Sequence, residues 1–147
     1  MIVSVRNARD RYLTATLKLA ANAYAEMLLS SQMIKNISIK IFIYDKLDKN
    51  AYGYCLPEEA SGKLRNFEIE IKRCRLNKML KFLAHEMVHV KQFAKNELSA
   101  KNKNGETITL WHGKLCDIEH YWDQPWEIEA FMLEEEMLNY LRKGYQI

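Results

Sequence analysis

The sequence contains few of the residues that break secondary structure or build disulfide frameworks. Of its 147 residues, two are proline, five are glycine and three are cysteine. The cysteines, Cys55, Cys74 and Cys116, are odd in number and include no C-x-x-C pair. This pattern argues against a disulfide-stabilised fold and against a zinc ribbon, and it indicates a reducing compartment.

Long apolar segments and a strong net charge are also missing. No run of 18 apolar residues occurs, so no membrane-spanning helix is predicted, and residues 1–10 lack the apolar core of a signal peptide. The net charge of +3 is too small to favour a nucleic-acid partner. We therefore expect a single cytoplasmic domain over residues 1–147, since its 48% hydrophobic residues suffice for a core.

The periodicity of apolar residues predicts an α+β fold in which a small sheet packs on three helices. The helices are expected over residues 8–33, over 77–95 with Asn77 as N-cap, and from 125 to about 143. Strands are expected over residues 37–43, 51–56 and 67–72, with Pro57 ending the second, and a hairpin over 107–111 and 114–118.

The most informative stretch is His-Glu-Met-Val-His at residues 85–89, which is an H-E-x-x-H motif. Residues four apart lie on the same face of a helix, so His85 and His89 can direct two imidazoles at one metal ion. Glu86 lies beside that ion without having to bind it, and a carboxylate there can accept a proton from an attacking water. The motif therefore predicts zinc-assisted hydrolysis with Glu86 as general base.

A catalytic zinc ion needs a third protein ligand, and the last predicted helix offers one. Residues 127–130 read Glu-Ile-Glu-Ala. Here the chain resembles the gluzincins, zinc peptidases whose third ligand is a Glu that opens an E-x-x-A stretch. The resemblance implies a zincin-like fold and the ligand set His85, His89 and Glu127.

One residue departs from the gluzincin pattern. Phe131 stands where many of these families carry Asp or Asn, and this leaves Glu129 as an alternative ligand. Glu127 and Glu129 lie about 200° apart around a helix, so only one of them can face the metal. The family spacing favours Glu127.

Two further resemblances concern His112. The run His112-Gly113-Lys114 is similar to the third-ligand region of SprT-like metallopeptidases, which are linked to proteins crosslinked to DNA. Residues 80–135 are also similar to small phage-encoded metallopeptidase-like proteins, which would place the chain in the cytoplasm of a host bacterium. In its predicted position at a hairpin tip, His112 is equally explained as a turn residue.

These observations predict a zinc-dependent metallopeptidase that acts on a peptide or protein substrate. His112, His120 or Tyr121 could stabilise the oxyanion, and the strand 67–72 could be the edge along which a peptide docks. A non-catalytic binding module with a structural metal, closed by a fourth ligand such as His112, remains an alternative. A DNA-associated protease is the other.

Overall fold

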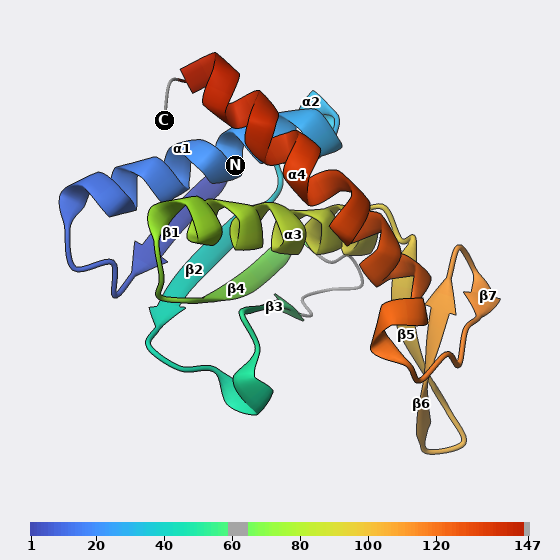
Figure 1. Cartoon of the computed structure of the whole chain (residues 1–147). Helices are drawn as coiled ribbons and strands as arrows, with labels where there is room; N and C mark the ends of the chain where they lie inside the picture. Colours follow the sequence, from blue (N-terminus) through green and yellow to red (C-terminus); the bar gives the residue numbers. More distant parts are fainter. Residues whose placement is uncertain (59–64, 146–147) are drawn as a thin grey trace.

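A computed structural model describes residues 1–58 and 65–145 of the chain, which form an α+β structure (Figure 1). In chain order the elements are β1 (Ile2–Arg6), α1 (Arg11–Leu28), α2 (Ser31–Ile34), β2 (Ser38–Tyr44), η1 (Asp48–Asn50), β3 (Gly53–Glu58), β4 (Asn66–Lys72), α3 (Leu76–Ala94), β5 (Leu98–Lys103), β6 (Glu106–Trp111), β7 (Lys114–Leu115), η2 (Tyr121–Asp123) and α4 (Pro125–Tyr145). The predicted α+β class is confirmed.

The main sheet has the strand order β1-β2-β4-β3 in the described part of the chain. β1, β2 and β4 are parallel, and β3 is antiparallel to β4. Side chains alternate between the two faces of a strand, and one face of β2 and of β4 is buried while the other is more exposed. The buried face consists of Ile39, Ile41, Ile43, Phe67, Ile69 and Ile71.

The helices cover that buried face in two layers. α1 and α3 lie side by side across the sheet, and α4 crosses α3 on the side away from the sheet (Figure 1). Ala130 in the second turn of α4 is fully buried. A residue this small allows helix backbones to approach closely, and the start of α4 lies next to the middle of α3.

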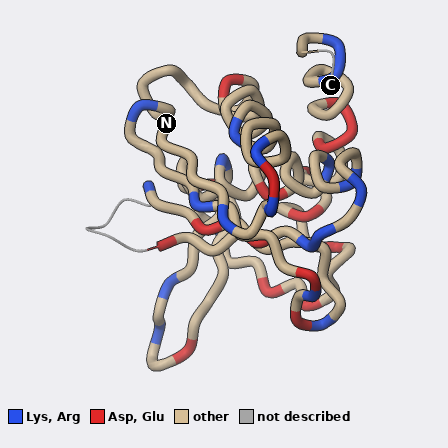
Figure 2. The backbone as a smooth tube through the Cα atoms, turned by 90° about the vertical axis from the view of Figure 1, so that its left-hand side faces the viewer, with Lys and Arg blue, Asp and Glu red and all other residues tan. Residues whose placement is uncertain are grey.

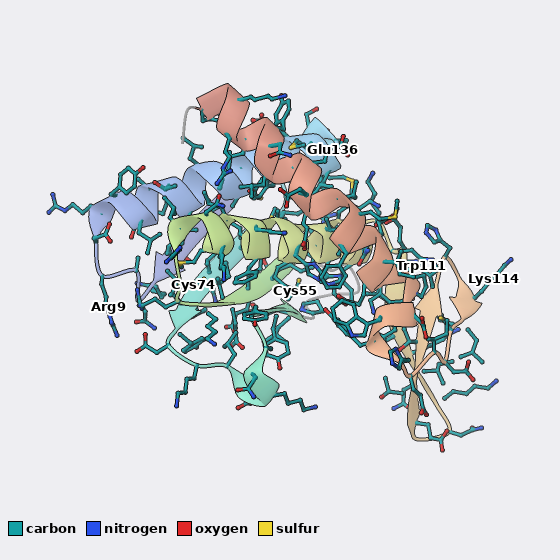
Figure 3. The ribbon with its side chains drawn as sticks, viewed as in Figure 1. Arg9, Cys55, Cys74, Trp111, Lys114 and Glu136 are labelled. Atoms are coloured by element: carbon teal, nitrogen blue, oxygen red, sulfur yellow. The ribbon has the colours of Figure 1, made fainter. Side chains whose placement is uncertain are left out.

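The second sheet, β5-β6-β7, projects from one end of the body beside the start of α4 (Figure 1). It consists of two tight hairpins. Asn104 and Gly105 have φ values of 53° and 81°, and His112 and Gly113 have φ values of 49° and 78°. Positive φ at both central residues is typical of type I′ turns. Trp111 anchors this sheet, because its ring packs 6.2 Å from the ring of Trp126 on α4 (Figure 3).

The N-terminal region differs from the helix predicted over residues 8–33. The strand β1, which was not predicted from the sequence, precedes the helix and pairs with β2. The side chain of Asp10 caps α1 by accepting from the N–H of Leu13. The helix ends at Leu28, and Ser30 then caps the separate turn α2.

Two predictions about the main sheet were wrong. The strand predicted over residues 67–72 exists as β4, but it lies between β2 and β3 and is therefore not an edge. Pro57 does not end the preceding strand but lies within β3. Proline is tolerated there because β3, among the described residues, pairs with β4 alone, and an edge strand can forgo one N–H.

The boundaries of the motif helix also differ from the prediction. The N-cap is Arg75, without a side-chain cap bond, so Asn77 lies inside α3. The helix ends at Ala94, and Asn96 adopts a left-handed φ of 58°, which turns the chain into the unpredicted strand β5. At the C-terminus α4 continues through Gly144 to Tyr145 instead of ending near Lys143.

The described elements show neither the strong charge of one sign nor the long apolar helices that some classes of binding protein need. Short segments of Lys and Arg and of Asp and Glu are scattered along the backbone between longer uncharged stretches (Figure 2). In the described residues, no helix has the length and apolar character required to cross a membrane.

The central position of β2 leads to a stability prediction. Ile41 is fully buried, and Ile41→Ala should lower the free energy of unfolding by about 2–5 kcal/mol, because it leaves a cavity between sheet and helices. Lys40→Ala, on the exposed face of the same strand, should cost less than about 0.5 kcal/mol. Urea denaturation measures both, and equal losses would contradict the assignment of the faces.

Candidate metal centre

The helix α3 places the two histidines of the motif one above the other. His85 and His89 are both 7% exposed, and their ring centroids lie 5.0 Å apart. Their neighbours Leu83, Met87 and Val90 are buried in the core, which fixes the rotation of α3 about its axis. The face that carries both histidines is therefore directed at α4.

The first turn of α4 contributes a carboxylate to the same point. The Oε1 atom of Glu127 lies 2.9 Å from Nε2 of His85 and 3.1 Å from Nε2 of His89. One ligand atom from each of these residues lies within 4.8 Å of the others, and all three residues are buried. The arrangement could hold a metal ion, as the ligand set inferred from the gluzincin resemblance requires.

Two further buried side chains orient the histidines. Nδ1 of His85 donates to Oε2 of Glu134 at 2.7 Å, and Nδ1 of His89 donates to Oε1 of Gln92 at 2.8 Å. The amide of Gln92 is itself oriented, because its Nε2 donates to the carbonyl of Trp126. With Nδ1 engaged as a donor, each ring presents its Nε2 atom to the common point.

Sequence reasoning did not identify Glu134 and Gln92. Phe131 occupies the position where the gluzincin pattern has Asp or Asn, and its ring packs edge-on against His85 at 4.6 Å instead of donating or accepting. The carboxylate comes from one turn further along α4. The sequence did contain a signal for Glu134, because residues seven apart on a helix, such as Glu127 and Glu134, share a helix face.

Glu129, the alternative third ligand, faces elsewhere. Its Oε1 lies 2.9 Å from Nζ of Lys91 and accepts from Nε2 of Gln92 at 3.0 Å. Lys91 also pairs with Glu97 at 2.8 Å, so it joins α3 to α4 and to the segment before β5. The structure therefore brings Glu127, and not Glu129, to the two histidines.

Glu86 lies between the histidines and the edge strand β3. A Cβ atom added at Gly53 would lie 2.9 Å from Oε1 of Glu86, so the glycine provides the space for this carboxylate. Cys55, two residues along β3, lies beneath α3 (Figure 3), and burial together with the charge of Glu86 raises the pKa of its thiol. Burial raises the pKa of Glu86 to about 7, although the nearby histidines oppose the shift.

The close contact between these groups also shifts the pKa values of the histidines and Glu127. Burial disfavours the charged form of His85, but hydrogen bonds to Glu127 and Glu134 outweigh it and raise its pKa to about 9. Burial likewise opposes a charge on Glu127, yet the hydrogen bonds to both histidines lower its pKa to about 2. These directions describe the protein without a metal ion, when a proton links the imidazoles to the carboxylate.

The remaining candidate side chains lie at different distances from this centre. Tyr121 is close to it, since burial and the charge of Glu127 raise the pKa of its phenol. His120 is exposed and pairs with Asp123 at 3.6 Å. His112 is exposed at the tip of the β6–β7 turn, where its ring packs edge-on against Trp111.

Compared with models of known protein families, with curated proteins and with solved structures, the chain matches none of them. The function is therefore inferred from the residues of the site itself.

The positions of the two glutamates generate a matched pair of variants. Glu127→Ala should lower the affinity for Zn²⁺ by more than the roughly 10–100-fold typical of changes around a metal site, because it removes a ligand. Glu129→Ala, two residues away, should cost less than about tenfold. Competition with a chelator measures both. A larger loss at Glu129 would show that the ligand is the other carboxylate, and equal small losses would move the third ligand to His112.

The raised pKa of His85 predicts a pH dependence of metal binding. Below about pH 9 this imidazole holds a proton that a metal ion must displace, whereas above its pKa no proton competes. Affinity for Zn²⁺ should thus rise with pH up to that value, by up to about tenfold per pH unit for each proton released. Calorimetry in buffers of different ionisation enthalpy counts the protons. An affinity that does not change over this range would contradict the assignment.

Proposed function

We propose that the protein is a zinc-dependent metallopeptidase with a zincin-like fold. The observation that carries the proposal is the convergence of His85, His89 and Glu127 on one buried point, with Glu86 beside it. Two imidazoles and one carboxylate form the ligand set of catalytic zinc in many hydrolases.

The surroundings of the three residues fit a zinc ion. Both Nε2 atoms point at one carboxylate oxygen, and both Nδ1 atoms are engaged by Glu134 and Gln92. Such outer hydrogen bonds raise the basicity of a ligand and fix its tautomer. When bound, zinc supplies a water of lowered pKa and polarises the scissile carbonyl.

The side chains of this protein would then move the protons. Glu86 accepts a proton from the attacking water and passes it to the leaving amine, and its pKa of about 7 suits a group that must do both near neutral pH. Tyr121 is the best placed of the three predicted donors, because its hydroxyl interacts with Glu127. Its raised pKa keeps the phenol protonated, as an oxyanion donor must be.

The docking edge for a peptide is β3 instead of the strand predicted from the sequence. β4 is enclosed by β2 and β3, whereas β3 pairs, among described residues, with β4 alone. Gly53 of β3 lies against Glu86, so a peptide paired with this strand would pass beside the general base. Backbone hydrogen bonds to an edge strand are a common mode of peptide recognition.

The geometry favours this function over the two alternatives. A structural zinc site fills all four positions with protein ligands, but the group found among the described residues has three members and His112 is not one of them. A DNA-associated protease would need a basic surface, and the chain carries a net charge of only +3 with both signs mixed along the backbone (Figure 2).

The role of Glu86 provides the decisive test. Glu86→Gln keeps the shape of the side chain but cannot accept a proton, so hydrolysis of a peptide library should fall about 10²-fold or more while about one zinc per chain is retained. Mass spectrometry of the peptides and elemental analysis measure the two quantities. Glu136→Gln, at an exposed position of α4, is the control and should keep full activity. A Glu86→Gln variant as active as the wild type would exclude the mechanism.

A further inference from the structure

A cluster of three aromatic side chains extends from the metal centre to the surface of the protein. The ring of Phe131 packs edge-on against His85 at 4.6 Å, and the ring of Trp122 stacks on Phe131 at 5.1 Å with an interplanar angle of 26°. Tyr121 packs against Phe131 at 6.1 Å. We call Tyr121, Trp122 and Phe131 the aromatic shelf.

The side chains of the aromatic shelf are more exposed to solvent than large aromatic rings usually are. Trp122 is 64% exposed and Tyr121 is 46% exposed, although both lie against other rings. The ring of Phe131, which both of them contact, is itself 36% exposed. Contiguous exposed apolar surface of this kind marks a binding site more often than it marks inert surface.

The position of the shelf relates it to the proposed reaction. Its inner ring touches a predicted zinc ligand, and Tyr121 also interacts with Glu127. A polypeptide whose scissile bond lay at the metal centre would therefore bring a neighbouring side chain over Phe131 and Trp122. Aromatic and large aliphatic side chains gain most from such a surface, through burial and through ring stacking.

We propose that the aromatic shelf holds an aromatic or large aliphatic side chain of the polypeptide bound at the metal centre, and so selects the substrate. This inference rests on the proposed function and deepens it from peptide hydrolysis in general to polypeptides with such a side chain next to the cleaved bond.

Local charge distinguishes a polypeptide from a nucleic acid as the occupant. Residues 117–136 contain eight Asp or Glu and no Lys or Arg. Lys81 and Lys91 of α3 pair with some of these carboxylates, but Asp117, Glu119 and Asp123 lie on the exposed surface. Stacked bases would bring phosphates into this acidic surround, where repulsion opposes binding, whereas an uncharged or basic polypeptide meets no such penalty.

Two small hydroxamates distinguish binding to the aromatic shelf from binding to the metal ion. The probes are acetohydroxamate and 3-phenylpropionohydroxamate, which share the metal-binding group but differ in the phenyl ring. We expect the zinc-loaded protein to bind the phenyl compound more tightly, and Trp122→Ala to lower that affinity about tenfold while leaving acetohydroxamate unchanged.

Two further variants control for loss of structure. Trp122→Phe keeps a ring in place and should retain most of the preference for the phenyl compound. Tyr140→Ala removes a 58% exposed ring elsewhere on α4 and should change neither affinity. Zinc content and thermal unfolding, measured on each variant, show whether the metal centre and the fold persist.

The possible outcomes distinguish failure of the proposed role of the shelf from failure of the proposed function. If both compounds bind and Trp122→Ala leaves their ratio unchanged, the shelf does not select the side chain, although the metal centre stands. If neither compound binds the zinc-loaded protein, the proposed function fails and the shelf with it. If a single-stranded oligonucleotide displaces the phenyl compound and requires Trp122 to do so, the occupant is a nucleic acid and the proposal is wrong.

Discussion

The packing of α4 against α3 is the contact on which the candidate site depends. Two imidazoles on one helix can define a direction, but a carboxylate from a second element has to meet them at a common point. Ala130, fully buried one turn after Glu127 on α4, allows the two helices to lie close together, and Glu127 then reaches both Nε2 atoms within 3.1 Å. A shift of either helix by a fraction of a turn would separate the three side chains.

That contact is held by interactions that also tune the site. Gln92 bonds to His89, to the backbone of Trp126 and to Glu129, so one buried amide connects a metal-directed imidazole with the first turn of α4. Glu134 bonds to His85 and lies 3.8 Å from Nζ of Lys81. Such side chains both join the helices and orient the histidines, so stability and metal affinity are coupled at this contact.

The sheet contributes the other wall of the site. β3 is the antiparallel edge strand, and its Gly53 leaves space for Glu86 where any larger residue would displace the carboxylate. On the opposite side, η2 and the start of α4 carry the aromatic side chains. The candidate site thus lies between a strand edge suited to backbone pairing and a surface suited to side-chain packing.

Local patterns in the sequence determined a good part of this protein. The period of two residues over 67–72 identified β4, and the period of 3.6 identified α3. His85, Glu86 and His89 were predicted from their spacing along one helix, and Glu127 from the resemblance to the gluzincin E-x-x-A pattern. Such patterns are readable because the residues concerned are neighbours on one element. The strand β1 was missed because five residues at a sheet edge carry little pattern, and its pairing with β2 lies more than 30 residues away.

Only the tertiary structure decided which carboxylate meets the histidines, which strand is the edge, and which side chains surround the site. The sequence favoured Glu127 over Glu129 only through the family spacing, and the rotation of α4 against α3 directs Glu127 inward and Glu129 to Lys91. The same holds for Glu134, Gln92 and Gly53, whose roles arise from contacts between elements distant in sequence. Those contacts follow from how whole faces pack, and no short segment of the sequence carries that information.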